Sequence, residues 1–476
     1  MHNSIIDQHR EQAMSFKSSF LKPLPAIIIL AGFLSQATSA WAATYYAAPN
    51  GSGTSCTIES PCAVNAALGK LTPGCTLYLR GGRYTGSTLS FAANGILEAR
   101  ITISGYPGET AIIDGQNIYP VGSCWAYLVS ISGDYVTIRD LQINNSNGAG
   151  LFLGGNYTHA KNVSLDVVGE SGIVASGKGN IIDGCTVSKN GQRYPTTCSS
   201  WGSAICAAGS TDAVIQNCIS HNNVGEGLNS YAGATGTIIQ NNISYENNGP
   251  NLYMDRTKNT IARGNILYYL TNPPPNSNFL IGSEGGDPSA NSNNNFYNNF
   301  LLGGKKNIYS PTYVKGDGLV NWIIAYNTLV NSTEMTTGNL CISSMVHSGT
   351  IIKNNIILQE NSGPICYITT ASGLTFSYNN WSKSPCANAS GTGDVIGDPK
   401  LAKIGPYGVG TLTAEYFKIL SSSAARDVGS AMSEITADFF GNNRLSGTYP
   451  DMGGHEYGDA INPNILNSPT GLRIVN

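Results

Sequence analysis

The sequence predicts an all-β fold, a solenoid of short strands that stack turn upon turn. Short apolar pieces, most of them built around asparagine, recur along the chain, and successive pieces begin 22 to 35 residues apart. Between them the apolar residues alternate with a period of two, and the alternation breaks at glycine and asparagine. No helical period persists across the repeats. Such a chain stacks its turns at a spacing of about 4.8 Å.

The composition agrees with a solenoid and excludes several other classes of protein. The chain has 476 residues, of which 41% are hydrophobic and only 12% charged, and its formal net charge is -3. The hydrophobic content is enough to build a large core, and the net negative charge does not favour electrostatic binding to nucleic acid. A surface rich in asparagine, glycine, serine and tyrosine suits sugars.

The first 42 residues have the features of a signal peptide. Lys17 and Lys22 precede an apolar run at 26–34, and Ala40-Trp41-Ala42 fits a cleavage site. The run is shorter than the ~20 residues that span a bilayer. We expect secretion to the extracellular space or the periplasm, with no membrane partner; an uncleaved anchor is the alternative.

Export makes disulfides the expected state of the cysteines. All 11 cysteines follow residue 42, and no C-x-x-C pair suggests zinc. The nearest local pairs are Cys56 with Cys62 and Cys198 with Cys206. An odd count leaves at least one thiol unpaired or bonded between chains.

Four segments are expected. Residues 1–42 are the signal peptide, and 43–75 form an N-terminal segment whose capping helix is predicted at Pro61 to Leu71. The solenoid occupies 76–393, and 394–476 form a loop-rich C-terminal cap. Asparagines repeated at one place in each turn are predicted to stack as an amide ladder inside a corner, which makes them structural.

Four stretches resemble a known group of exported proteins. They are Tyr45 to Gly51, Leu77 to Tyr84, Ile103 to Glu109 and the ending Asp451 to Tyr457. They are similar to right-handed parallel β-helix proteins of the pectin-lyase-like superfamily. The resemblance implies a right-handed parallel β-helix, but not one activity, because the superfamily holds polysaccharide lyases, glycoside hydrolases, uronate epimerases and binding proteins.

One outward face of the solenoid carries the candidate site. Aligning turns by their apolar residues places Ile173, Leu228, Leu252 and Leu280 in one inward column. Tyr231 then lies against Asp255, and Arg256 against Glu284, about one turn spacing apart. The outward residues form a wall suited to sugars; the alternative is a surface salt bridge among exposed tyrosines.

A lyase needs a cation to neutralise a uronate carboxylate and a base to take the neighbouring proton. Arg256 is the candidate cation, and the candidate bases are Tyr231, Lys258 and His221. Ca²⁺ is the candidate cofactor, because acidic side chains offer it oxygen ligands; the candidates are Glu170, Glu226, Glu284 and Asp287. Pectate lyases of this fold carry a lysine beside an Asp-rich calcium cluster, which this sequence lacks, and related alginate lyases place a lysine where Tyr231 follows Glu226.

A second pattern allows hydrolysis. Glu170 and Glu226 occupy similar glycine-flanked corners with one turn between them, which predicts a separation of about 9.6 Å. That value lies at the upper edge of the ~6.5–9.5 Å range of inverting glycoside hydrolases. The alternative is a pair of solvated turn residues.

The sequence therefore predicts a monomeric, secreted polysaccharide lyase that acts on a uronate-containing chain. Its predicted catalytic residues are Tyr231, Asp255, Arg256 and Glu226. Its predicted substrate contacts are Asn229, Tyr253, Lys258 and Glu284. An inverting glycoside hydrolase and a non-catalytic glycan-binding or adhesive β-helix are the two alternatives.

Overall fold

A computed structural model describes residues 42–458, except for 195, 199, 200 and 315. The predicted signal peptide, apart from its last residue, and the final part of the predicted C-terminal cap lie outside the described residues. Within them, no helix has the length and apolar character of a membrane span.

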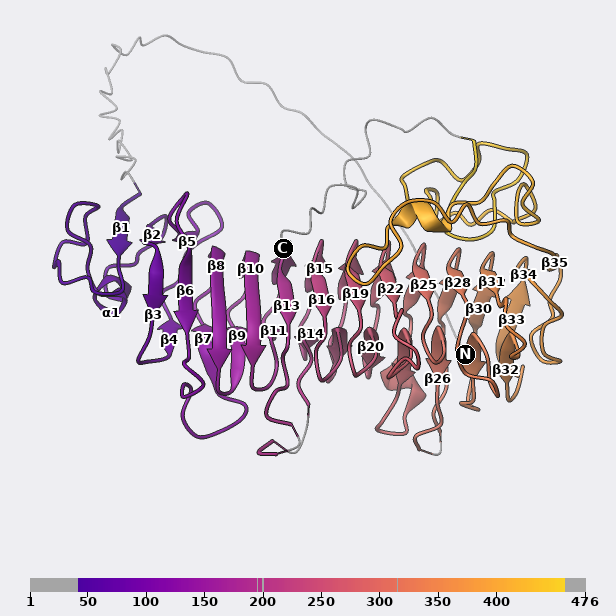
Figure 1. Cartoon of the computed structure of the whole chain (residues 1–476), viewed down its shortest axis with the longest axis horizontal. Helices are drawn as coiled ribbons and strands as arrows, with labels where there is room; N and C mark the ends of the chain where they lie inside the picture. The colour runs from indigo at the N-terminus through magenta and orange to yellow at the C-terminus, as the bar shows by residue number, and fades with distance from the viewer. Residues whose placement is uncertain (1–41, 195, 199–200, 315, 459–476) are drawn as a thin grey trace, which may run out of the picture. The chain divides into compact units, whose positions relative to one another are not determined.

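The described chain is a parallel β-helix in which short strands pair with their counterparts one turn away (Figure 1). One ladder is an 11-stranded sheet. Its strands are β4 (Leu89–Phe91), β7 (Tyr127–Ile131), β9 (Ala149–Leu153), β11 (Ile173–Ala175), β14 (Ile205–Ala208), β17 (Leu228–Tyr231), β20 (Leu252–Asp255), β23 (Phe279–Gly282), β26 (Ile308–Ser310), β29 (Leu340–Ile342) and β32 (Cys366–Ile368).

A 24-stranded sheet holds two further ladders, which share the long strands β8 (Val136–Ser146) and β10 (His159–Val168). The remaining strands of one ladder are β1 (Thr44–Ala47), β2 (Thr76–Leu79), β5 (Ile101–Gly105), β12 (Ile181–Asp183), β15 (Val214–Gln216), β18 (Ile238–Gln240), β21 (Ile261–Arg263), β24 (Asn295–Tyr297), β27 (Ile323–Ala325), β30 (Thr350–Lys353) and β33 (Leu374–Ser377). Those of the other are β3 (Gly82–Tyr84), β6 (Ala111–Asp114), β13 (Thr186–Ser188), β16 (Ile219–His221), β19 (Ile243–Tyr245), β22 (Ile266–Tyr268), β25 (Phe300–Leu302), β28 (Thr328–Val330), β31 (Ile356–Leu358), β34 (Asn380–Trp381) and β35 (Val395–Ile396).

Buried columns of apolar residues fill the interior. In the 11-stranded sheet one column joins Ile173, Ile205, Leu228, Leu252 and Phe279 in successive turns, and all five are fully buried. The alternation of inward and outward side chains along each strand produces this column, as the period of two predicted. The all-β solenoid is therefore confirmed.

The predicted asparagine ladder is also confirmed. Asn265 donates through Nδ2 to Oδ1 of Asn299 over 2.9 Å, and the contact continues to Asn327 and Asn355 over 3.0 Å each. All are buried. The residues just before two of them, Asn298 and Asn354, have φ of 53° and 58°, a left-handed conformation that asparagine tolerates better than most residues. The repeated asparagines therefore build the corner.

The two covers of the solenoid differ from each other. At the start, helix α1 (Val64–Leu68) lies within the predicted Pro61 to Leu71 and buries Ala67 in the core. The C-terminal segment, with the short helix η2 (Ala414–Phe417), instead lies along the side of the solenoid beside the later turns (Figure 1). It packs on outward apolar residues such as Ile266 and Phe300.

Three disulfides lie in the described chain. Cys56 pairs with Cys62 as expected, and Cys366 pairs with Cys386. The suggested Cys198–Cys206 pair is wrong, because Cys198 bonds to Cys124, 74 residues earlier, while Cys206 is a buried free thiol. The two bonded cysteines lie in the loops before β7 and β14, which belong to turns that are not neighbours in the 11-stranded sheet.

Candidate functional site

An open cleft of about 420 Å³ lies on the outward side of the 11-stranded sheet. Residues of strands β17 and β20 line it, and loops before β7, β11, β14 and β17 and after β23 border it. Its lining consists of polar and aromatic side chains, with four carboxylates and one guanidinium. The lining residues are Trp125, Glu170, Ser171, Tyr194, Trp201, Gly202, Ser203, Glu226, Asn229, Tyr231, Tyr253, Asp255, Arg256 and Glu284.

Strand register brings the outward residues together. Asn229 pairs with Tyr253 in the next turn, and continuing the same register sets Tyr231 beside Asp255. The predicted inward position of Leu280 is wrong, because Phe279 pairs with Leu252 and Leu280 stands outward beside Tyr253. Four consecutive buried residues in β23 give no alternation from which a register could be chosen.

Asp255 organises one side of the cleft. Its side chain is 3% exposed, and Oδ2 accepts a 2.9 Å hydrogen bond from Nε of Arg256. Its Oδ1 accepts from the backbone N–H of Glu284 over 3.1 Å. The Arg256 side chain is 43% exposed, so its terminal nitrogens reach beyond this pair toward the cleft. The expected Arg256–Glu284 pair is replaced by the pair with Asp255, and Glu284 instead accepts from the hydroxyl of Tyr253 over 2.8 Å.

The backbone at this corner contributes to the position of Arg256. Arg256 has φ of 48°, and Ala232, at the corresponding corner one turn earlier, has φ of 57°. A side chain other than glycine seldom adopts this left-handed conformation. The stacked corner therefore imposes it, and it sets the direction in which the guanidinium leaves the strand.

Glu226 and Glu170 lie on the other side of the cleft. Glu226 accepts from the indole N–H of Trp201 and from the hydroxyl of Ser203, each over 2.9 Å. Glu170 accepts from the backbone N–H of Ser171 over 2.5 Å through Oε2. The two glutamates are only 8% and 1% exposed, which contradicts the alternative of solvated turn residues. One strand of the 11-stranded sheet, β14, lies between their turns, as expected.

Burial changes the acid–base behaviour of the cleft. Loss of hydration raises the pKa of Glu170 and of Glu226 above the ordinary value of a glutamate. The neighbouring Cys206 sulfur is the main cause that raises the pKa of Tyr231, and burial adds to the shift. Burial also raises the pKa of Tyr253. The hydrogen bond to Asp255 raises the pKa of Arg256, which therefore keeps its charge. The cleft holds a permanent cation beside groups that retain or readily accept protons.

Most of the predicted site residues share this cleft. It contains the four predicted catalytic residues and, among the predicted substrate contacts, Asn229, Tyr253 and Glu284. Lys258 is exposed beyond the end of β20 and is not among the lining residues. His221 stacks on Tyr245 in the other sheet, with ring centres 4.9 Å apart. Of the predicted bases, Tyr231 is the one that lines the cleft.

Sequence reasoning missed the aromatic border of the cleft. Trp125, Tyr194 and Trp201 come from two loops that the Cys124–Cys198 disulfide joins. The long connection between β13 and β14 does not show in the sequence which earlier loop it meets. The correct cysteine pairing would have been the signal.

The residues present do not form a calcium site. In the described part of the chain, no three His, Cys, Asp or Glu side chains gather in a metal-binding arrangement. Two buried oxygens, Oε1 of Glu170 and Oδ1 of Asn229, lack a partner, but Ca²⁺ takes six to eight oxygen ligands. Both oxygens of Glu226 already accept hydrogen bonds from protein donors. We therefore derive no step through a metal ion.

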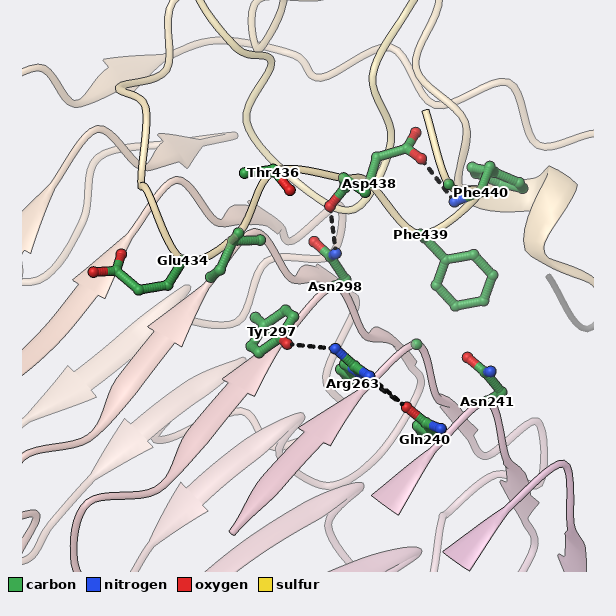
Figure 2. Close-up of a pocket in the computed structure, with 14 residues that line it drawn as sticks. Gln240, Asn241, Arg263, Tyr297, Asn298, Glu434, Thr436, Asp438, Phe439 and Phe440 are labelled. Carbon is green, nitrogen blue, oxygen red and sulfur yellow. Dashed lines mark hydrogen bonds between the residues drawn. The ribbon is translucent and has the colours of Figure 1, made fainter. Parts of the chain in front are cut away.

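A second pocket of about 330 Å³ lies between the later turns and the C-terminal segment (Figure 2). There Arg263 donates to Gln240 and to the hydroxyl of Tyr297, so neighbouring side chains already occupy its guanidinium. Asn298 donates to a backbone carbonyl of the C-terminal segment. The Asn298 contact joins the segment to the solenoid, and the guanidinium of Arg263 is bound within the solenoid, whereas the first cleft has a cation with free hydrogen-bonding capacity.

Comparisons with known proteins agree with the fold. Residues 45–265 match the family described as "Pel9A-like, right handed beta helix region". A stretch of 80 residues is 38% identical to pectate lyase PEL9 of Emericella nidulans; it covers 16% of this chain and only one fifth of that relative.

Two solved structures have the same architecture at low identity. The crystal structure of pectate lyase Pel9A gives a TM-score of 0.53 at 18% identity, covering 87% of this chain and 96% of the other. A rhamnogalacturonan lyase gives 0.50 at 13% identity, covering 71% and 87%. At these identities the likeness shows the fold alone. The stacked parallel turns show that the chain is a parallel β-helix, and over residues 45–265 it is similar to the right-handed β-helix region of the Pel9A-like family.

Proposed function

We propose that this protein is a polysaccharide lyase that cleaves a uronate-containing chain in the cleft by β-elimination. The observation that carries the proposal is Arg256, the one cation among the described residues that line the cleft. It stands beside tyrosines and carboxylates on an open strand face. The matched stretch of a pectate lyase and the lyase structures of the same fold support the reaction class.

Arg256 neutralises the substrate carboxylate. Elimination places negative charge on the uronate carboxylate and the carbon next to it, and a fixed guanidinium stabilises that charge. Asp255 accepts a hydrogen bond from Nε of Arg256 and so restricts the rotamers of that side chain. The terminal nitrogens of Arg256 are thereby oriented before the substrate binds. Asp255 thus acts as a positioning residue.

Glu226 and Tyr231 provide the proton transfers. Ionised Glu226 takes the proton from the carbon next to the carboxylate, and its raised pKa makes it a stronger base than an exposed glutamate. The electron pair of that C–H bond forms the new double bond as the glycosidic C–O bond breaks. Tyr231, which its raised pKa keeps protonated, gives its proton to the departing oxygen. The proton on Glu226 then returns to Tyr231 through solvent.

The test is formation of the unsaturated product. The mature protein is incubated with polygalacturonate, alginate and glycosaminoglycans, with added Ca²⁺ and with a chelator, while ultraviolet absorbance is followed. We expect absorbance to rise on one uronate polymer and to persist in the chelator. Absence of the rise on every polymer in both conditions would refute the proposal.

Hydrolysis is a second candidate, because Glu170 and Glu226 are both buried in the cleft with raised pKa values. An inverting glycoside hydrolase uses one protonated carboxyl group as general acid and one ionised carboxylate as general base. Reducing ends would then form without the absorbance of a double bond. Glu170→Gln would abolish that reaction, whereas the lyase assigns Glu170 no proton transfer.

Export of the chain follows from the same proposal, since a polymer substrate lies outside the cell. The three disulfides support it, because such bonds persist in oxidising compartments.

A further inference from the structure

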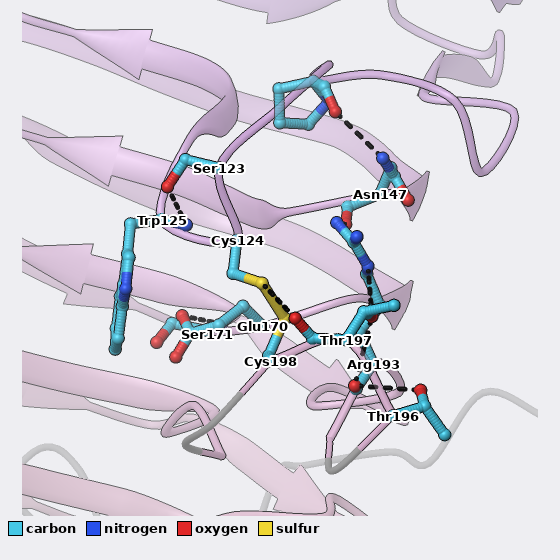
Figure 3. The surroundings of a disulfide bond; sticks show 11 residues. Ser123, Cys124, Trp125, Asn147, Glu170, Ser171, Arg193, Thr196, Thr197 and Cys198 are labelled. Carbon is cyan, nitrogen blue, oxygen red and sulfur yellow. Dashed lines mark hydrogen bonds between the residues drawn. A yellow bond between two sulfur atoms is a disulfide. The ribbon is translucent and has the colours of Figure 1, made fainter.

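Two loops from different turns meet at the border of the cleft. One connects β6 with β7 and the other connects β13 with β14, and the Cys124–Cys198 disulfide joins them with a Cα–Cα distance of 6.0 Å (Figure 3). In addition, Arg193 of the second loop donates to the backbone carbonyl of Asn147 over 2.7 Å. The loop that carries Trp125 is therefore tied to the body of the solenoid.

The tie places an exposed tryptophan at the cleft. Trp125 follows Cys124 directly, is 56% exposed, and lies beside Glu170 in the cleft lining (Figure 3). A large aromatic ring in water, next to a carboxylate, contributes little to folding, because it leaves its apolar faces hydrated. Its position therefore suggests a ligand with an apolar face.

Trp201 differs from Trp125 in its contacts. Its indole N–H is bound to Glu226, and its ring lies edge to face with Tyr194, 5.6 Å between centres. Trp201 is thus held by the protein itself. Trp125 is the aromatic side chain of this border that remains open to a ligand.

We propose that Trp125 is a stacking platform for one pyranose ring of the polysaccharide. Its subsite lies next to that of the reacting sugar, toward the N-terminal turns of the solenoid. A pyranose ring presents a face of C–H groups, which an indole covers while the sugar hydroxyls remain hydrated. The Cys124–Cys198 disulfide keeps the platform in place. The inference rests on the proposed function in one respect, namely that the reacting sugar lies at Arg256.

The first test replaces the ring. Trp125→Ala is compared with Trp125→Phe and with a control, Val121→Ala, whose side chain is exposed on the same loop and does not line the cleft. We expect Trp125→Ala to raise KM for the cleaved polymer about tenfold, which corresponds to about 1.4 kcal/mol of binding free energy, with kcat within twofold. Trp125→Phe should recover most of the loss, and the control should behave as wild type.

Oligomer length locates the subsite. Binding of uronic-acid oligomers of two to six sugars is measured by calorimetry in the Glu226→Gln background, in which the ligand is not consumed. Trp125→Ala should lower the affinity for the hexamer about tenfold and leave the affinity for the dimer unchanged. Equal weakening of both lengths would contradict a separate subsite.

The second test removes the disulfide. Cys124→Ser with Cys198→Ser should raise KM in the same direction, because the loop no longer holds the ring in place. Removing the distant Cys56–Cys62 disulfide is the control and should leave KM unchanged. Unchanged KM in the Cys124/Cys198 variant would remove the disulfide from the proposal.

The outcomes separate this inference from the proposed lyase. Unsaturated product with unchanged KM and oligomer affinity in Trp125→Ala would overturn the platform and leave the lyase standing. Oligomer binding that depends on Trp125, without product of any polymer, would overturn the lyase and leave the platform. Wild-type protein that neither binds nor cleaves any uronate polymer would overturn both.

Discussion

Two outward faces of the same solenoid have opposite characters. On the 11-stranded sheet, strands β17 and β20 present polar residues such as Asn229 and Tyr253 to an open cleft. On the 24-stranded sheet, β22 and β25 present Ile266 and Phe300, which the C-terminal segment covers. The inward residues of both faces are apolar and build one core. The outward residues therefore decide whether a face stays open or is covered by another part of the chain.

On the covered face, loss of an aromatic side chain should lower the stability of the protein more than on the open face. Phe300 is fully buried, with Phe417 and Phe439 stacked on it at 4.6 and 4.3 Å between centres. Phe300→Ala should lower the free energy of unfolding by about 3–5 kcal/mol, through lost burial and the cavity left behind. Thermal unfolding measures it, with the exposed Tyr367→Ala as the control. Activity below the melting temperature should persist, and an unchanged melting temperature would show that the segment does not depend on this contact.

The open face should respond to substitution in activity rather than in stability. Arg256→Ala removes the proposed carboxylate clamp and should lower kcat/KM by about 10²–10³, or about 2.7–4 kcal/mol of transition-state stabilisation. The melting temperature should change little, because a partly exposed ion pair contributes only ~0–1 kcal/mol. Arg256→Lys keeps the charge and should retain part of the activity. Full activity together with a wild-type melting temperature in Arg256→Ala would remove Arg256 from the site.

At the asparagine corner, which joins the two ladders of the 24-stranded sheet, we expect an effect between these extremes. Asn327→Ala breaks the amide ladder, because the backbone N–H and Nδ2 of Asn299 lose Oδ1 of Asn327 and Oδ1 of Asn355 loses one of its donors. We expect a loss of about 1–3 kcal/mol in the free energy of unfolding. The control is Asn156→Ala, an exposed asparagine that donates to Asp134. Equal melting temperatures of the two variants would show that the ladder is not a source of stability.

The covered face should also show a stability that depends on pH. Burial raises the pKa of Glu456, in the C-terminal segment, to about 8 from a usual 4.5, with Asp451 adding to the shift. A raised pKa means that the folded state binds the proton more tightly, so this contribution to stability is complete below pH 4.5 and declines as the pH rises toward about 8. Arg444, Asp438 and Asp451 share the buried cluster.

Glu456→Gln should therefore flatten the fall in melting temperature between about pH 5 and pH 8, since the amide does not ionise. Glu415→Gln, on the partly exposed partner of Lys418, is the control. Parallel melting curves of wild type and Glu456→Gln over that range would assign the pH dependence to other groups.

The sequence alone determined the repeating features of this protein. Alternation along the strands defines the core, and asparagine at one place in each turn defines the corner, because each repeat imposes the same geometry on its neighbours. The spacing of residues along single strands also predicted that Tyr231, Asp255 and Arg256 share one face, because the outward residues of stacked strands must line up.

Tertiary structure alone decided what happens where the repeats differ. The register of β23 could not be chosen from a run of four buried residues, and so Arg256 was paired with Glu284 instead of Asp255. The Cys124–Cys198 bond, the aromatic border and the segment over Phe300 join residues that lie far apart in the sequence. Contacts of that kind depend on which loops meet in space, which no local period encodes. The solenoid thus follows from local repetition, whereas the cleft depends on the inserts that break it.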